Sequence, residues 1–189
     1  MKPYTRLATV MTLAGTLSLG VAAHAETVVT STAITEAEVL AAQEAWCDAL
    51  VAISTTHDAQ GLPAAKALAG EVLDAAYGYQ MGAVLFKPTL TVVPQTFRPT
   101  REGALAYFVG DDPTFPNDTG FALKGWTDCS ARNNAIFIAG DSAMSIGNVD
   151  ITGKDGSVTT VDKTWGYVKD DAGALRIVLH HSSLPYNPG

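Results

Sequence analysis

The chain has 189 residues and a formal net charge of −7, with 12 Lys and Arg residues against 19 Asp and Glu residues. An acidic chain without a basic stripe is a poor partner for nucleic acid or for an anionic membrane surface, so we expect neither. The length fits one domain with a hydrophobic core of its own.

Residues 1–25 have the pattern of a secretory signal peptide. A basic start is followed by the apolar residues 7–22 and by the small-x-small cleavage pattern Ala23-His24-Ala25. We therefore predict cleavage after Ala25 and a periplasmic or secreted protein without a membrane anchor. Residues 26–34 are expected to form a flexible segment, and residues 35–189 a single domain.

Start and stop signals mark three helices in the first half of the chain. Thr35 and Glu38 form a capping box, in which each side chain bonds to the backbone N–H of the other residue. Gly61 then breaks the pattern, and Pro63 suits the first turn of a second helix. The predicted helices span residues 35–54, 62–78 and 100–109.

Further along the chain, strand patterns dominate. Residues 83–93 are apolar and rich in β-branched side chains, and Pro88 places that strand at an edge or a bulge. Short turns separate the later strands, which therefore form antiparallel hairpins. These strands are predicted at residues 121–127, 134–139, 143–152, 158–169 and 174–182. Helices followed by a strand meander indicate an α+β fold with helices on one face of a bent sheet.

The end of the chain pairs a Trp-bearing strand and a glycine turn with a final strand that ends in His, Ser and Pro. The residues concerned are Trp165, Gly173, His180, Ser182 and Pro185, and an earlier element reads Phe86-Lys87-Pro88-Thr89. This pattern resembles the nuclear transport factor 2-like superfamily, and within it the association domain of calcium/calmodulin-dependent protein kinase and its exported bacterial relatives.

The resemblance implies a cone-shaped, curved antiparallel sheet with N-terminal helices packed on its concave face, a cystatin-like roll. The superfamily includes isomerase-like, dehydratase-like and polyketide cyclase-like enzymes as well as non-catalytic dimerisation modules. The fold alone therefore leaves the function open.

His180 is the candidate catalytic residue. Neighbours on a strand point to opposite faces, so His180 and His181 cannot share one site. His180 falls on the polar side with Ser182, whereas His181 falls with Ile177 and Leu179 and is expected in the core. An imidazole with an ordinary pKa of about 6.5 suits general acid–base catalysis. The alternative is a histidine held by hydrogen bonds at a strand end or a dimer interface.

Four further residues are candidates for ligand binding. Lys163 and Trp165 share one strand face, which suits a small anionic or aromatic ligand, or else a partner subunit. Asn148 interrupts an apolar run and either faces a cavity or makes a cross-strand hydrogen bond. His57 continues the inward arc of the first helix, although a helix C-terminus favours a histidine cation without any ligand.

Cys47 and Cys129 are the only cysteines. Their even number and the predicted export favour a disulfide, and two separate buried thiols are the alternative. Without CxxC spacing or a Gly-rich phosphate loop, the chain is expected to use no metal or other cofactor. We interpret Arg98, Arg101 and Lys124, which flank the third helix, as solvated surface charges rather than an anion site.

These features favour an exported homodimer that binds a small molecule between helices and sheet. The first alternative is a cofactor-independent isomerase, dehydratase or hydrolase that uses His180 as acid or base. In that enzyme, Lys163 or Asn148 would stabilise developing negative charge. The second alternative is a non-catalytic assembly module.

Overall fold

A computed structural model of the chain describes residues 31–188, so the predicted signal peptide and its cleavage site lie outside the described residues. The elements in chain order are α1 (Glu36–Gln60), α2 (Leu62–Ala76), β1 (Leu85–Lys87), α3 (Arg101–Val109), the 3-10 turn η1 (Phe121–Leu123), β2 (Trp126–Ala139), β3 (Ser142–Gly153), β4 (Val158–Lys169) and β5 (Leu175–Ser183). Within the described part of the chain, no helix is both long and apolar enough to span a membrane.

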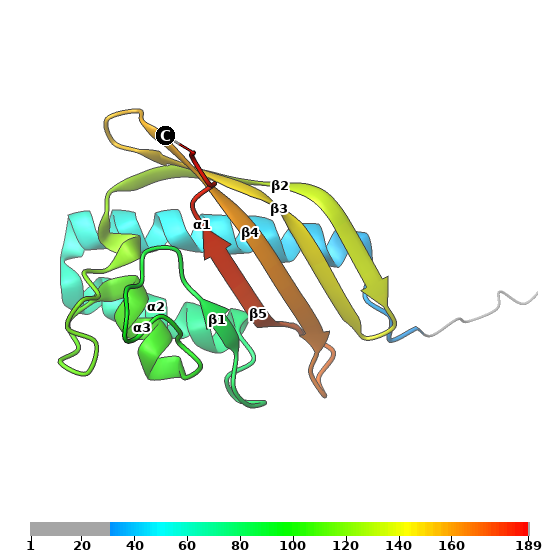
Figure 1. The fold of residues 1–189 in the computed structure, drawn as a ribbon. Coiled ribbons are helices and arrows are strands. Elements are labelled where there is room, and N and C mark those ends of the chain that lie inside the picture. Colours follow the sequence, from blue (N-terminus) through cyan, green and yellow to red (C-terminus); the bar gives the residue numbers. More distant parts are fainter. Residues whose placement is uncertain (1–30, 189) are drawn as a thin grey trace, which may run out of the picture. The chain divides into compact units, whose positions relative to one another are not determined.

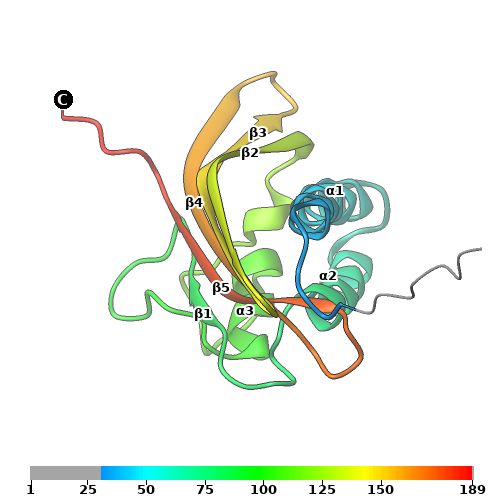
Figure 2. The same ribbon diagram turned by 90° about the vertical axis from the view of Figure 1, so that its right-hand side faces the viewer.

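The five strands form one curved sheet in the order β1-β5-β4-β3-β2 (Figure 1). β2 to β5 pair as antiparallel hairpins, whereas the short β1 runs parallel to β5. The three helices lie on the concave side of the sheet (Figure 2). This arrangement confirms the predicted α+β fold, and it places the core between the helices and one face of the sheet.

The predicted helix signals are present in the structure. The Thr35 side chain accepts from the Glu38 N–H, and the Glu38 carboxylate accepts from the Thr35 N–H, which completes the capping box of α1. α1 continues past the predicted end to Gln60, because no helix-breaking residue occurs before Gly61, which has φ 82°. Thr100 caps α3 as expected.

Three predicted strands differ from the structure. Residues 121–123 form a 3-10 turn, and the strand predicted over 134–139 begins earlier, at Trp126 after Gly125 with φ 77°, so it includes the end of the strand predicted over 121–127. The strand predicted over residues 83–93 is reduced to β1, because Pro88 has no N–H to continue the ladder. Packing also begins earlier than expected, since Ile34 is buried and its N–H bonds to the Gly140 carbonyl.

A β-bulge in β5 places His181 on the opposite face of the sheet from the one predicted. Gly166 pairs with Leu179 but Tyr167 pairs with Ile177, so Val178 is an extra residue in β5. Beyond the bulge, His180 lies on the same inner face as Ile177, and His181 is exposed on the outer face. The expectation that His181 belongs to the core was therefore wrong.

Arg98 is not the solvated surface charge that the sequence suggested. Its guanidinium makes a bidentate ion pair with Asp118, with distances of 2.7–2.9 Å, and the two side chains are only 2% and 3% exposed. Arg98 also donates to the Gln95 and Phe97 carbonyls. The pair fixes the segment before α3 to the loop after it, and both Arg98 and Asp118 lie outside helices and strands.

Candidate active site

His180 occupies the centre of the buried inner face. It lies on β5 opposite Phe86 of β1 and Trp165 of β4, and its ring stacks on Phe86 with 4.4 Å between centroids. The side chain is 2% exposed. Burial lowers the pKa of His180 well below its ordinary value, and the nearby Lys163 charge lowers it further. The imidazole is therefore neutral at physiological pH.

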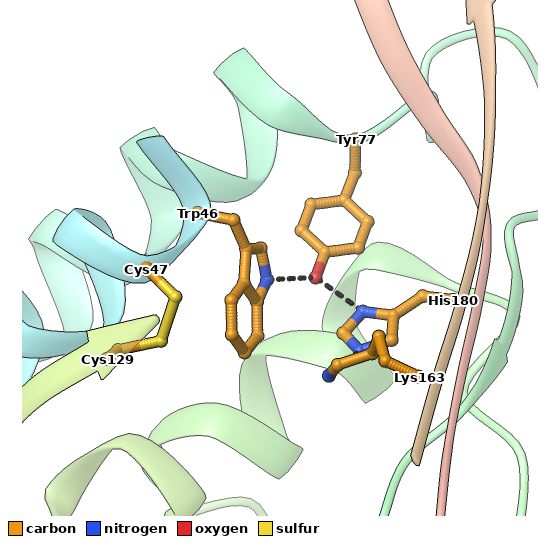
Figure 3. Close-up of a disulfide and its surroundings, with 6 residues drawn as sticks. All are labelled: Trp46, Cys47, Tyr77, Cys129, Lys163 and His180. Carbon is orange, nitrogen blue, oxygen red and sulfur yellow. Dashed lines mark hydrogen bonds between the residues drawn. A yellow bond between two sulfur atoms is a disulfide. The ribbon is translucent and has the colours of Figure 1, made fainter. Parts of the chain in front are cut away.

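A chain of hydrogen bonds from α1 holds the imidazole. Trp46 Nε1 donates to the Tyr77 hydroxyl at 2.9 Å, and that hydroxyl lies 2.8 Å from His180 Nδ1 (Figure 3). Because the indole N–H only donates, the Tyr77 O–H is free to donate to Nδ1, which leaves the imidazole hydrogen on Nε2. Tyr77 is itself anchored, since it caps α2 and bridges to Ile177 of β5.

Lys163 faces the other imidazole nitrogen. Its Nζ lies 2.8 Å from His180 Nε2, 4.3 Å from the centre of the Trp46 ring and 5.2 Å from that of Trp165. Among the described residues it has no ion-pair partner, and burial lowers its pKa to about 7. A neutral amine can accept the Nε2–H of His180. The Trp46 N–H, the Tyr77 O–H and the His180 Nε2–H then each have an acceptor. We call Lys163 and His180 the amine–imidazole pair.

The amine–imidazole pair predicts a stability that depends on pH. Between pH about 7 and 10.5 the unfolded chain binds a proton at Lys163 that the folded chain does not, so the free energy of unfolding should rise with pH. One such group contributes up to about 1.4 kcal/mol per pH unit. Urea unfolding across this range should show the rise, and Lys163→Met should reduce the slope while the exposed Lys154→Met leaves it unchanged. Equal slopes for wild type and Lys163→Met would contradict the assignment.

A group of three hydroxyls begins opposite Lys163 with Ser182 and extends through Thr89 to Tyr107. Ser182 lies two residues beyond His180 and directly opposite Lys163 in the β4–β5 ladder, and its Oγ accepts from Thr89 Oγ1 at 2.6 Å. The Tyr107 hydroxyl on α3 is buried without a partner of good geometry among the described residues. Burial raises the pKa of Tyr107, and the nearby Leu90 and Thr89 partly offset the rise. We call Thr89, Ser182 and Tyr107 the hydroxyl cluster.

A small cleft reaches Tyr107 of the hydroxyl cluster from the surface. Its volume is about 40 Å³. Because a cavity needs a volume of only about 10–15 Å³ to hold one water, the cleft has room for more than one water. Its lining consists of Leu90, Tyr107, Asn117, Asp118, Thr119, Phe121 and Lys124. The cleft therefore gives a triatomic molecule or a small anion a path to Tyr107.

The structure brings together His180, Lys163 and Trp165 but not the other two predicted ligand-binding residues. Asn148 donates to Asp162 across the β3–β4 ladder, which is the cross-strand alternative. His57 lies in the last turn of α1, where its carbonyl accepts from Gly61.

Sequence reasoning missed Thr89 and Tyr107 as site residues. Ser182 could have been found from its i, i+2 spacing to His180 on a strand, and Thr89 from the Phe86–Thr89 element. Tyr107 lies in the apolar stretch 103–109 of α3, whose pattern gives no indication of a catalytic or binding role.

The predicted disulfide between Cys47 and Cys129 is present and joins α1 to β2. Cys47 directly follows Trp46, so the covalent link holds the part of α1 that begins the hydrogen-bond chain to His180 (Figure 3). Among the described residues, no group of three or more His, Cys, Asp and Glu side chains is arranged to hold a metal ion. What the site offers is therefore a buried amine, an imidazole and hydroxyls.

Comparison with known proteins gives consistent matches. The model of a family described as "MICAH: Metal-independent carbonic anhydrase" matches residues 37–184. A "Metal-independent carbonic anhydrase" from Nostoc sp. (strain PCC 7120 / SAG 25.82 / UTEX 2576) is 64% identical over 161 residues, which cover 85% of this chain and 78% of that protein.

Solved structures agree with this match and with the predicted fold. The crystal structure of an iota-carbonic anhydrase from a cyanobacterium, complexed with bicarbonate, has a TM-score of 0.84 and 63% identity over 86% of this chain and 99% of its own. A putative calcium/calmodulin-dependent protein kinase II association domain from Xanthomonas campestris has a TM-score of 0.51 and 25% identity, covering 84% and 97%. The second match confirms the resemblance seen at the end of the sequence.

Proposed function

Because the chain belongs to the metal-independent carbonic anhydrase family, we propose that it catalyses the reversible hydration of CO₂ to bicarbonate with its own side chains. The observation that carries the proposal is the amine–imidazole pair, buried opposite Ser182 in a chain of this family. This function corresponds to the cofactor-independent enzyme among the sequence hypotheses, and it is favoured over a domain that only binds a ligand.

The reaction needs an acceptor for a proton of water and donors for the charge that develops on the oxygens of CO₂. The amine–imidazole pair supplies the acceptor. After it takes up one proton, Lys163 is an ammonium that donates to Nε2, and the neutral imidazole carries its hydrogen on Nδ1, towards Tyr77. The Trp46 and Trp165 rings stabilise that ammonium, because an aromatic face attracts a cation.

The hydroxyl cluster supplies the donors. The Tyr107 hydroxyl has no partner of good geometry within the described residues, although Leu90 and Thr89 are near it, so it can donate to an oxygen of CO₂ or bicarbonate. Ser182 lies opposite Lys163, so an anion held at Ser182 adjoins the proton acceptor. Water that enters through the cleft then attacks carbon between the donors and the acceptor.

The proposed function is tested by stopped-flow CO₂ hydration with chelator-treated protein. We expect acceleration that survives chelation and increases as pH rises through about 7, where Lys163 loses its proton. A rate equal to that of buffer would refute the proposal.

Tyr107→Phe should weaken the interaction with bicarbonate. A hydrogen bond to a charged group contributes about 1.5–3 kcal/mol, so KM for bicarbonate should rise roughly tenfold or more. Melting temperature should fall little, because the hydroxyl makes no hydrogen bond of good geometry among the described residues and only weaker contacts with Leu90 and Thr89. Tyr79→Phe is the matched control, since that hydroxyl bonds to the Arg98 carbonyl outside the site. Equal KM values for wild type and Tyr107→Phe would contradict the role given to this hydroxyl.

We propose a homodimer built on the outer face of the sheet. Phe137 of β2 and its cross-strand neighbour Met144 of β3 are 62% and 50% exposed, and Ile146 is also 50% exposed. Such an apolar face suits a second copy of the chain. Ile146→Glu should give monomers in light scattering, whereas Met81→Glu, away from the sheet, should not. A wild-type monomer would refute the dimer.

We also infer that the mature chain is periplasmic or secreted. Support comes from the signal-peptide pattern of residues 1–25 and from the Cys47–Cys129 disulfide, which is typical of an oxidising compartment. Sequencing the N-terminus of the protein isolated from its host should give Glu26 first, and retention of Met1 would refute the inference.

A further inference from the structure

We propose that CO₂ modifies Lys163 reversibly, forming a carbamate on Nζ that switches the site off when CO₂ is abundant. This inference rests on the proposed function, because it requires CO₂ to reach the amine–imidazole pair. It assigns to Lys163 a modification in addition to its role as proton acceptor.

The first support is the surroundings of Nζ. A lysine amine reacts with CO₂ only in its uncharged form, and most lysines are ammonium ions held by carboxylates or water. Lys163 is 5% exposed, and its described neighbours at Nζ are an imidazole and two indole rings. No carboxylate in the described part of the chain pairs with it, so no anion there opposes the loss of its proton.

Titration of the surrounding groups agrees with this geometry. Burial lowers the pKa of Lys163 to about 7, so the amine is mostly uncharged in mildly alkaline solution. The titratable groups around its imidazole partner are Tyr77, which touches Nδ1, and His181 on the outer face of β5. Burial raises the pKa of Tyr77 well above its usual value, so this phenol stays neutral and supplies no negative charge to hold an ammonium.

The second support is an unused donor on one of the two indole rings that surround the amine. Trp165 Nε1 is buried and has no acceptor among the described residues, although its ring centre is 5.2 Å from Lys163 Nζ. A buried N–H without a partner is costly, so this one calls for an acceptor that the protein itself does not provide. A carbamate oxygen on Lys163 would be such an acceptor.

The chemical step balances within the amine–imidazole pair. When the imidazole hydrogen is on Nδ1, Tyr77 accepts it with its second lone pair, Nε2 accepts one N–H of Lys163, and the Nζ lone pair is free. Nζ then attacks the carbon of CO₂: a C–N bond forms, one C–O π bond breaks, and its electron pair moves to oxygen. Nε2 takes the proton that nitrogen loses. The products are a carbamate and an imidazolium, so the buried pair gains no net charge.

Carbamylation removes the proton acceptor. A carbamate nitrogen is not basic, because its lone pair is delocalised into the carboxylate, and the imidazolium is already protonated. Hydration activity should therefore fall at high CO₂ and recover when CO₂ is removed, since the step is reversible.

The test is covalent trapping. Wild-type protein is equilibrated with CO₂ in mildly alkaline buffer, treated with triethyloxonium to esterify carbamates, digested and analysed by mass spectrometry. We expect the ethyl carbamate on Lys163 and not on the exposed Lys154. Isotope-labelled CO₂ should transfer its label to the same peptide. Absence of the ester from Lys163, or equal labelling of Lys154, would overturn the proposal.

Two variants make the test specific. Trp165→Phe keeps an aromatic ring but lacks the N–H, and loss of one hydrogen bond to an anion should lower the trapped yield about tenfold. Lys66→Met, at an exposed lysine on α2, should leave the yield unchanged. An unaltered yield in Trp165→Phe would overturn the proposed carbamate site. If the protein hydrates CO₂ but no carbamate is trapped on Lys163, only this inference is refuted. If the carbamate is trapped but the protein does not hydrate CO₂, the proposed function is refuted instead.

Discussion

Lys163→Met should lower kcat/KM for CO₂ hydration at least about a hundredfold, since a positioned general base typically contributes 10²–10⁴-fold. Met fills nearly the same volume between Trp46 and Trp165, so the aromatic packing should persist while the proton acceptor is lost. Stopped-flow assays with a pH indicator measure the rate directly. Unfolding in urea at the same pH shows whether the variant is folded.

Two further variants show whether activity is lost because the general base is absent or because the contacts of the lysine side chain are absent. Lys163→Arg keeps a cation near the indole rings, but a guanidinium cannot release its proton in this pH range, so activity should not return. Lys154→Met, at an exposed lysine, should retain wild-type activity. A folded Lys163→Met variant with full activity would show that the amine is not the base.

Removing the disulfide should be the most damaging change to stability. Cys47 and Cys129 are 82 residues apart in sequence, and the chain-entropy relation for a loop of that size gives about 4–5 kcal/mol. The double variant Cys47→Ala, Cys129→Ala should lose about this much free energy of unfolding in urea titrations. Wild-type protein unfolded with a thiol reductant present should lose a similar amount.

The disulfide also bears on activity, because Cys47 is next to Trp46. Without the covalent link, α1 is held to β2 by packing and by the Gln43–Asn133 hydrogen bonds, and the Trp46–Tyr77 hydrogen bond should be formed for less of the time. We expect a smaller loss of activity than in Lys163→Met. The Ser130→Ala variant, beside Cys129 but outside the disulfide, is the control. Unchanged stability in the double cysteine variant would contradict the account of the fold.

Much of the fold could be predicted because its signals are local. The Thr35 capping box, Gly61 and the Thr100 cap each act on residues within one turn, and the turns between strands select antiparallel pairing. The errors occurred where the structure depends on pairing between strands that are separated in the sequence. The β5 bulge depends on how Gly166 and Tyr167 meet the neighbouring strand, so alternation along β5 alone assigned the wrong face to His181.

The site was predictable in part for the same reason. His180, Lys163 and Trp165 lie on two strands joined by a turn, and their shared face follows from the hairpin. Tyr107 comes from α3 and Thr89 from the end of β1, and only tertiary packing brings them to Ser182. Arg98 was misread because its partner Asp118 is 20 residues away in an irregular loop. The residues around Arg98 in the sequence give no indication that it forms a buried ion pair.

Exchange of oxygen isotope between CO₂ and water, followed by mass spectrometry at chemical equilibrium, tests whether this protein hydrates CO₂ with Lys163 as the base. It measures interconversion of CO₂ and bicarbonate without an indicator or a net pH change. Chelator-treated wild-type protein should accelerate the exchange, and Lys163→Met, correctly folded, should not. Exchange at the uncatalysed rate with wild-type protein, or equal acceleration by Lys163→Met, would contradict the role proposed for Lys163.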